Sequence, residues 1–280
     1  MTGPSQPMNE KLFEANANAC GTDKSRYHGY HRFYPLFLSQ LDQNEPFTIV
    51  EIGYGNGDSL ILWRKLFPKA FIVCLDRDMS ESGDGYTVLK VDQSDTHALE
   101  DAMEAIPQPV RLIIDDGSHH PEHQLSTFSI FFKEILQPKG TYIIEDIETS
   151  YWLCGNLYGY TMRYGLFNRW STIEALKLAA DHLNRKFLSP EDRNLLEYSM
   201  MLTGLSPEST SLINMISFAQ NCVIMNRSTD QDLAYAEQQY TYARFTARRG
   251  DLAPLEPGSG QQTYPEPPAQ ETGGEAQEST

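Results

Sequence analysis

Five short apolar segments alternate with helix-like segments in the first 150 residues, and this alternation constrains the fold more than any other feature. The segments recur about every 20–30 residues, which is the spacing of strand and crossover helix in a parallel sheet covered on both faces. The predicted strands are residues 47–52, 70–75, 87–91, 110–114 and 141–144. The pattern therefore predicts a doubly wound α/β sheet.

The pattern changes after Trp152, where longer helical segments replace the strand–helix alternation. Helices are predicted at residues 58–67, 95–105, 123–136, 172–186 and 190–201. The runs LINMISF and NCVIM then predict an antiparallel β-hairpin at the sheet edge. We therefore expect a Rossmann-like, doubly wound sheet of seven strands, with an antiparallel last strand and a helical insertion before the final hairpin.

Four segments are expected along the chain. Residues 1–45 should form an N-terminal helical segment, residues 46–228 the Rossmann-like domain, and residues 229–250 a C-terminal helical segment. Residues 251–280 contain six acidic side chains, no Lys or Arg, and few apolar ones. Such a segment cannot offset its ordering entropy, so we expect a disordered acidic tail.

The composition limits the partners of the chain. A formal net charge of −16 argues against a nucleic-acid backbone, which requires basic patches. No apolar stretch reaches the roughly 18 residues of a membrane span, and the first residues lack the pattern of a secretory signal. We expect a cytoplasmic protein with a small-molecule or glycan substrate and no membrane partner, and a homo-oligomer is compatible with the sequence.

A glycine-rich run, EIGYGNGD, joins the first predicted strand to the following helix. Glycines at this position allow a tight turn and close approach of a ligand to the backbone. Glu51, Gly53 and Gly55 are therefore candidate cofactor-binding residues. The spacing GxGxG differs from the dinucleotide fingerprint GxGxxG. A tight turn without a ligand is the alternative.

Acidic residues follow the next two strands. Asp76 ends the second predicted strand, where a carboxylate can accept hydrogen bonds from the ribose hydroxyls of an adenosine-type ligand. The alternative for Asp76 is a helix cap or a surface salt bridge. Asp92 ends the third strand and could meet the adenine edge, although a plain turn explains it as well.

Two acidic pairs, Asp115-Asp116 and Glu145-Asp146, follow the fourth and fifth strands. Ligands of an open parallel sheet bind beyond the carboxyl ends of its strands, so both pairs should face the same crevice. Carboxylates that converge there repel one another unless a cation lies between them. A hard divalent ion, Mg²⁺ or Mn²⁺, suits such oxygen ligands best. Helix capping is the alternative.

Histidines follow the first of these acidic pairs. His119 lies close to the same crevice, and a histidine with its ordinary pKa of ~6.5 can accept a proton near neutral pH. It is the candidate catalytic base. His120 and His123 raise the alternative of a zinc site. Zinc is the less suitable ion here, because the neighbouring ligands are carboxylates rather than thiolates.

Together these motifs resemble the metal-dependent sugar O-methyltransferases that modify deoxysugars of macrolide antibiotics, with the cephalosporin hydroxylase-like proteins as relatives. The resemblance covers residues 21–226 and is carried by four runs: GTDK at residues 21–24, EIGYGNGDS, DDGSHH and IEDIETSYW. It implies a class I methyltransferase that uses S-adenosylmethionine and Mg²⁺ or Mn²⁺. It also implies that the GTDK segment, with the tyrosines after it, forms a lid over the cofactor.

The resemblance assigns roles residue by residue. It implies that Asp116, Glu145 and Asp146 are the metal ligands and that His119 is the general base. It matches Gly53, Gly55 and Asp76 to the cofactor site. From their places at the strand ends, Glu51, Asp92 and Asp115 are expected to bind the cofactor as well.

The expected activity is methylation of a deoxysugar hydroxyl, rhamnose-like, on a glycosylated small molecule or glycan. A metal-dependent O-methyltransferase that acts on a phenol or catechol is the first alternative. An NAD-dependent oxidoreductase is the second, and a non-catalytic module with the same fold is the third.

Overall fold

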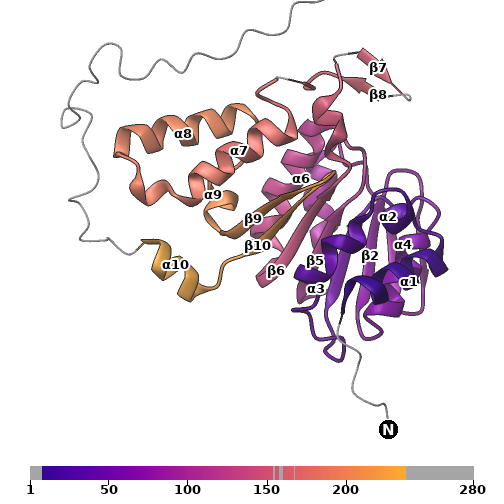
Figure 1. Cartoon of the computed structure of the whole chain (residues 1–280). Coiled ribbons are helices and arrows are strands. Elements are labelled where there is room, and N and C mark those ends of the chain that lie inside the picture. Colours follow the sequence, from indigo (N-terminus) through magenta and orange to yellow (C-terminus); the bar gives the residue numbers. More distant parts are fainter. Residues whose placement is uncertain (1–7, 154, 158–159, 167, 238–280) are drawn as a thin grey trace, which may run out of the picture. The chain divides into compact units, whose positions relative to one another are not determined.

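An eight-stranded sheet forms the centre of the protein, with strand order β3-β4-β2-β1-β5-β6-β10-β9 (Figure 1). The computed structural model describes residues 8–153, 155–157, 160–166 and 168–237. The strands are β1 (Thr48–Ile52), β2 (Phe71–Asp76), β3 (Glu81–Gly83), β4 (Tyr86–Lys90), β5 (Val110–Asp115), β6 (Leu136–Glu145), β9 (Ile213–Ala219) and β10 (Cys222–Arg227). The seven predicted strands are all present, and the short edge strand β3 is an addition.

The strand directions confirm the predicted topology. Strands β4, β2, β1, β5 and β6 run parallel to one another, whereas β3 pairs antiparallel with β4 and β10 pairs antiparallel with both β6 and β9. A small separate sheet pairs β7 (Gly155–Leu157) with β8 (Tyr160–Met162). The carboxyl ends of the five parallel strands therefore lie at one edge of the sheet.

Helices cover both faces of the sheet. Those near the N-terminus are α1 (Glu10–Cys20), α2 (Asp23–Arg26), α3 (Tyr34–Leu38) and α4 (Asp58–Leu66), and those between the later strands are α5 (Thr96–Met103) and α6 (Pro121–Glu134). The insertion after β6 contains α7 (Thr172–Leu183), α8 (Pro190–Leu202) and α9 (Pro207–Ser211), and α10 (Asp230–Glu237) follows the last strand. The insertion lies beside the β9–β10 edge in Figure 1.

Alternate strand residues point to opposite faces, and this alternation divides the core into two clusters. Val50 and Ile52 of β1 pack in one cluster with α5, α6 and α7. Ile49 packs in the other with α1, α3 and α4. The same alternation assigns the acids at the strand ends: Glu51 falls on the α1–α4 face and Asp115 on the opposite face.

Two of the predicted segments lie partly or wholly outside the described residues. Of the C-terminal helical segment predicted at 229–250, the structure describes α10, and the tail predicted at 251–280 is not described. Within the described part of the chain, no helix is both long enough and apolar enough to span a membrane.

Candidate active site

The glycine-rich loop after β1 forms one wall of a cavity of about 330 Å³ at the carboxyl ends of the strands. The cavity is lined by loop residues between 53 and 59, by the turn Gly21-Thr22-Asp23, and by Asp116. Gly53 has φ +94°, and a Cβ there would lie 2.1 Å from the carbonyl oxygen of Asp116. Only glycine lets the two strand ends approach so closely. Gly55, with φ +52°, has open space where a Cβ would be.

Asp76 lies at the end of β2 beside this loop. Its carboxylate accepts hydrogen bonds from the backbone N–H groups of Tyr54 at 3.2 Å, Asp78 at 2.8 Å and Met79 at 2.9 Å. Partial burial would raise the pKa of Asp76, but these donors outweigh it and lower the pKa. Asp76 is thus held as a carboxylate next to Tyr54, which lines the cavity.

Asp92 is exposed and binds its own turn. Its Oδ1 accepts from the backbone N–H of Ser94 at 2.9 Å and from the Ser94 hydroxyl at 2.7 Å. These contacts are those of the plain turn that was the alternative for this residue. The predicted adenine contact of Asp92 stays a prediction.

Neither Glu51 nor Asp115 is among the described residues that line the cavity. Fully buried Glu51 accepts from the Ser59 hydroxyl at 2.8 Å and from the Trp63 indole at 3.0 Å, and so anchors α4. Both oxygens of Asp115 accept from the Gln93 amide, at 2.8 and 2.9 Å. Burial raises the pKa of Asp115 to about 6, although Gln93 opposes this. Their predicted cofactor contacts stay predictions.

Lys24 of α2 lies buried among three of the strand-end carboxylates. Its Nζ is 2.7 Å from Asp116 Oδ2, 2.8 Å from Glu145 Oε2 and 3.5 Å from Glu51 Oε1. Burial alone would lower the pKa of Lys24, but the three carboxylates outweigh it and raise the pKa well above the usual value. A metal ion was the expected counter-charge of these acids, and Lys24 is a second cation that the sequence did not reveal.

Glu145 is held by this lysine and by a tyrosine. Its Oε2 binds Lys24, and its Oε1 accepts a hydrogen bond from the Tyr34 hydroxyl. The side chain is almost fully buried. Each carboxylate oxygen can accept more than one bond, so these contacts leave room for a metal ion, and the role of Glu145 as a ligand stays a prediction.

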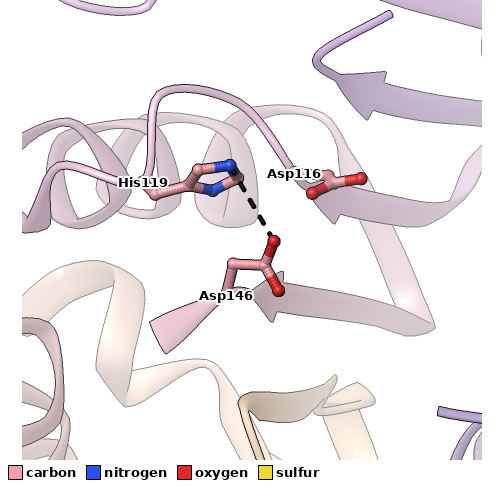
Figure 2. A group of neighbouring side chains, drawn as sticks. All are labelled: Asp116, His119 and Asp146. Atoms are coloured by element: carbon pink, nitrogen blue, oxygen red, sulfur yellow. Dashed lines mark ion pairs between the residues drawn. The ribbon is translucent and has the colours of Figure 1, made fainter. Parts of the chain in front are cut away.

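Asp116, His119 and Asp146 form a group whose ligand atoms lie within 4.8 Å of one another. Figure 2 shows the three side chains directed toward a common point, with His119 Nε2 3.9 Å from Asp146 Oδ2. His119 and Asp146 have φ values of +56° and +51°, which non-glycine residues seldom adopt. Such backbone strain persists where surrounding contacts hold it, and it gathers at functional sites.

Asp146 is fixed by side chains from distant parts of the chain. Its Oδ1 accepts from the Tyr30 hydroxyl at 2.7 Å and from the Asn221 amide at 2.9 Å, and lies 3.2 Å from His28 Nδ1. Asn221 occupies the turn between β9 and β10. These contacts hold the carboxylate beside His119.

The alternative zinc site is not assembled. In the described part of the chain, His120 and His123 do not belong to the group formed by Asp116, His119 and Asp146. His123 Nδ1 instead lies 2.8 Å from the Ser118 hydroxyl. The two carboxylates of the group, Asp116 and Asp146, offer the hard oxygen ligands that Mg²⁺ or Mn²⁺ prefers, and the His119 imidazole lies beside them.

The fold is that of the class I methyltransferases. The structure is similar to crystal structures of the MycE methyltransferase of mycinamycin biosynthesis, with a TM-score of 0.61 and 21% identity over 77% of this chain and 54% of MycE. That MycE structure holds Mg, SAH and mycinamycin VI, and a second crystal form with Mg and SAH gives a TM-score of 0.63. No protein-family model matches the chain.

Curated relatives are similar over part of the sequence. The 2'-O-methyltransferase of rhamnosyl tetracenomycin C from Streptomyces olivaceus is 36% identical over 47% of this chain. Demethylmacrocin O-methyltransferase from Streptomyces fradiae is 34% identical over 44%, and mycinamicin VI 2''-O-methyltransferase from Micromonospora griseorubida is 33% identical over 39%. The matched parts span 36%, 33% and 29% of these relatives' own lengths.

Proposed function

We propose that the protein is an S-adenosylmethionine-dependent, divalent-metal-dependent O-methyltransferase that acts on a sugar hydroxyl of a glycosylated small molecule. One observation carries the proposal: the glycine-walled cavity adjoins the group formed by Asp116, His119 and Asp146, and Asp116 belongs to both. The named activities of the three relatives support the acceptor class, since one methylates rhamnosyl tetracenomycin C and the other two are O-methyltransferases of demethylmacrocin and mycinamicin VI.

The cofactor would bind in the cavity between the glycine-rich loop and the Gly21-Thr22-Asp23 turn. Gly55 leaves space against the backbone, and Asp76 keeps a charged carboxylate beside Tyr54. A carboxylate there can accept hydrogen bonds from ribose hydroxyls. Glu51 and the Asp115–Gln93 pair would support the cofactor site indirectly. Glu51 holds α4, and the pair holds the loop after β5.

Asp116 and Asp146 would hold the metal ion. When bound, a divalent ion supplies positive charge that lowers the pKa of a nearby hydroxyl. His119 would accept the proton of the acceptor hydroxyl at its imidazole, and Asp146 at 3.9 Å would stabilise the imidazolium that results. The rest of the rate gain would come from holding the acceptor oxygen in line with the methyl donor.

Metal removal tests this function most directly. Treatment with EDTA should abolish methyl transfer, and Mg²⁺ or Mn²⁺ should restore it, because Lys24 offsets only part of the charge of four neighbouring carboxylates. S-adenosylhomocysteine, and not NADH, should raise the melting temperature. Full turnover by metal-stripped protein, or stabilisation by NADH alone, would show that the proposed chemistry is wrong.

The acceptor should be a sugar with two adjacent hydroxyls, rhamnose-like and already attached to a larger molecule. Two neighbouring oxygens can both face the Asp116–Asp146 pair, which fixes the oxygen that meets the methyl donor. Removing the hydroxyl next to the methylated one should lower kcat/KM at least about tenfold, or ~1.4 kcal/mol. The measurement compares glycosides that differ only in that hydroxyl. Equal rates would exclude the diol and return the choice to other acceptors, phenols included.

A further inference from the structure

A single short segment contributes to both the cofactor cavity and the metal-binding group. We define the cap segment as residues 21–34, which include α2 and the tyrosines that follow it. Gly21, Thr22 and Asp23 line the cavity. The next residue, Lys24, turns inward and is fully buried. The two sites are thus joined through consecutive residues of one helical turn.

Lys24 reaches residues of both sites. It lies 2.7 Å from Asp116, a proposed metal ligand, and 3.5 Å from Glu51, which holds Ser59 of the cavity wall at 2.8 Å. Strand alternation explains this meeting, because Glu51 and Glu145 lie on the α1–α4 face, where α2 packs. Lys24, which directly follows the cavity-lining residues in the chain, therefore fixes the position of the Asp116 carboxylate.

A second link runs through His28 of the same segment. Its Nε2 lies 3.6 Å from Asp23, which lines the cavity, and its Nδ1 lies 3.2 Å from Asp146. Tyr30 of the segment also donates to Asp146. Both proposed metal ligands are therefore held by side chains of the cap segment.

We propose that Lys24 is a positioning residue through which cofactor binding strengthens metal binding, an inference that rests on the function proposed above. A ligand that contacts Gly21, Thr22 and Asp23 restricts the motion of α2. Lys24 is then fixed, and so is the Asp116 carboxylate that it binds. The metal ion meets ligands that are already arranged, so less ordering entropy is lost when it binds. By linkage, the metal ion must strengthen cofactor binding by the same factor.

Calorimetry of the full chain tests the coupling. Mn²⁺ is titrated into metal-stripped protein with and without saturating S-adenosylhomocysteine, a probe that carries no net charge to attract or repel the ion. We expect S-adenosylhomocysteine to lower the Kd of Mn²⁺ by about fivefold or more, within the range of common coupling energies. The reverse titration, S-adenosylhomocysteine with and without Mn²⁺, should give the same factor.

Lys24→Met keeps the length of the side chain and removes its charge. The coupling factor should fall below about twofold in this variant. The matched control is Lys177→Met, which removes an exposed lysine paired with Glu174 on α7, away from both sites. It should keep the wild-type factor. If Lys24→Met does not fold, the double variant Lys24→Met/Glu51→Gln, which removes a buried negative charge as well, takes its place.

The outcomes separate this inference from the proposed function. If both ligands bind the wild type with less than a twofold mutual effect, the inference is overturned and the proposed function stands. Unchanged coupling in the Lys24 variant also overturns it, because the link then runs elsewhere. If the wild type binds neither ligand, the proposed function fails and this inference fails with it.

Discussion

Asp146→Asn should lower kcat/KM for methyl transfer by about a thousandfold, or ~4 kcal/mol of transition-state stabilisation. The amide keeps the shape of the side chain and an oxygen that can accept from Tyr30, so the local structure should survive. It loses the negative charge that would hold a metal ion and stabilise the imidazolium of His119. Steady-state kinetics at saturating Mg²⁺ measure the loss.

Two further measurements locate the effect. The affinity for S-adenosylhomocysteine in the absence of metal should change little, because Asp146 is outside the cavity lining in the described part of the chain. Mn²⁺ affinity should fall at least about tenfold. Asp181→Asn, an exposed carboxylate on α7, is the matched control and should behave as wild type. Near-normal turnover in Asp146→Asn would remove this residue from the proposed metal site.

Gly53→Ala should lower the free energy of unfolding by about 3 kcal/mol and sharply weaken cofactor binding. The backbone there has φ +94°, and the added methyl group would lie 2.1 Å from the Asp116 carbonyl oxygen. Strands β1 and β5 would have to separate at their carboxyl ends, where the cavity lies. Urea unfolding and calorimetry with S-adenosylhomocysteine measure the two effects.

Gly204→Ala separates backbone strain from steric conflict. Gly204 also has a positive φ, +83°, but open space surrounds the position of a Cβ. Its substitution should cost only about 1 kcal/mol of strain and leave cofactor affinity unchanged. If Gly53→Ala is no more destabilising than Gly204→Ala, the close approach of the two strand ends is not the reason that position 53 requires glycine.

The parallel sheet was predictable because each strand is a short apolar run followed by a helix of recognisable period. The predicted strand 110–114 is β5, one residue longer, and the hairpin runs became β9 and β10. The short strand β3 was missed, since Glu81–Gly83 contains no apolar residue. Local sequence patterns thus predicted the strands that bury apolar side chains, and they missed β3, which has none to bury.

The candidate site was predictable only as a set of strand-end acids. Alternation along the strands could have placed Glu51 and Glu145 on the α1–α4 face, since each is two residues from an isoleucine of that cluster, Ile49 or Ile143. The partner of these acids was not predictable in this way. Lys24 stands in a helix of four residues, too short to show a period, and it reaches Glu145 across 121 positions of sequence. Only the packed structure brings them together.

The contacts of Asp146 also bear on the order in which the protein becomes competent during its synthesis. Tyr30 and Asn221 bind the same carboxylate oxygen although they stand 191 positions apart. Chains emerge from the ribosome N-terminus first, at about 5–20 residues per second. When the cap segment and the glycine-rich loop have emerged, the nascent chain still lacks the Asn221 amide. That amide becomes available only when the β9–β10 turn has emerged. The site is therefore completed only after all five parallel strands have been synthesised.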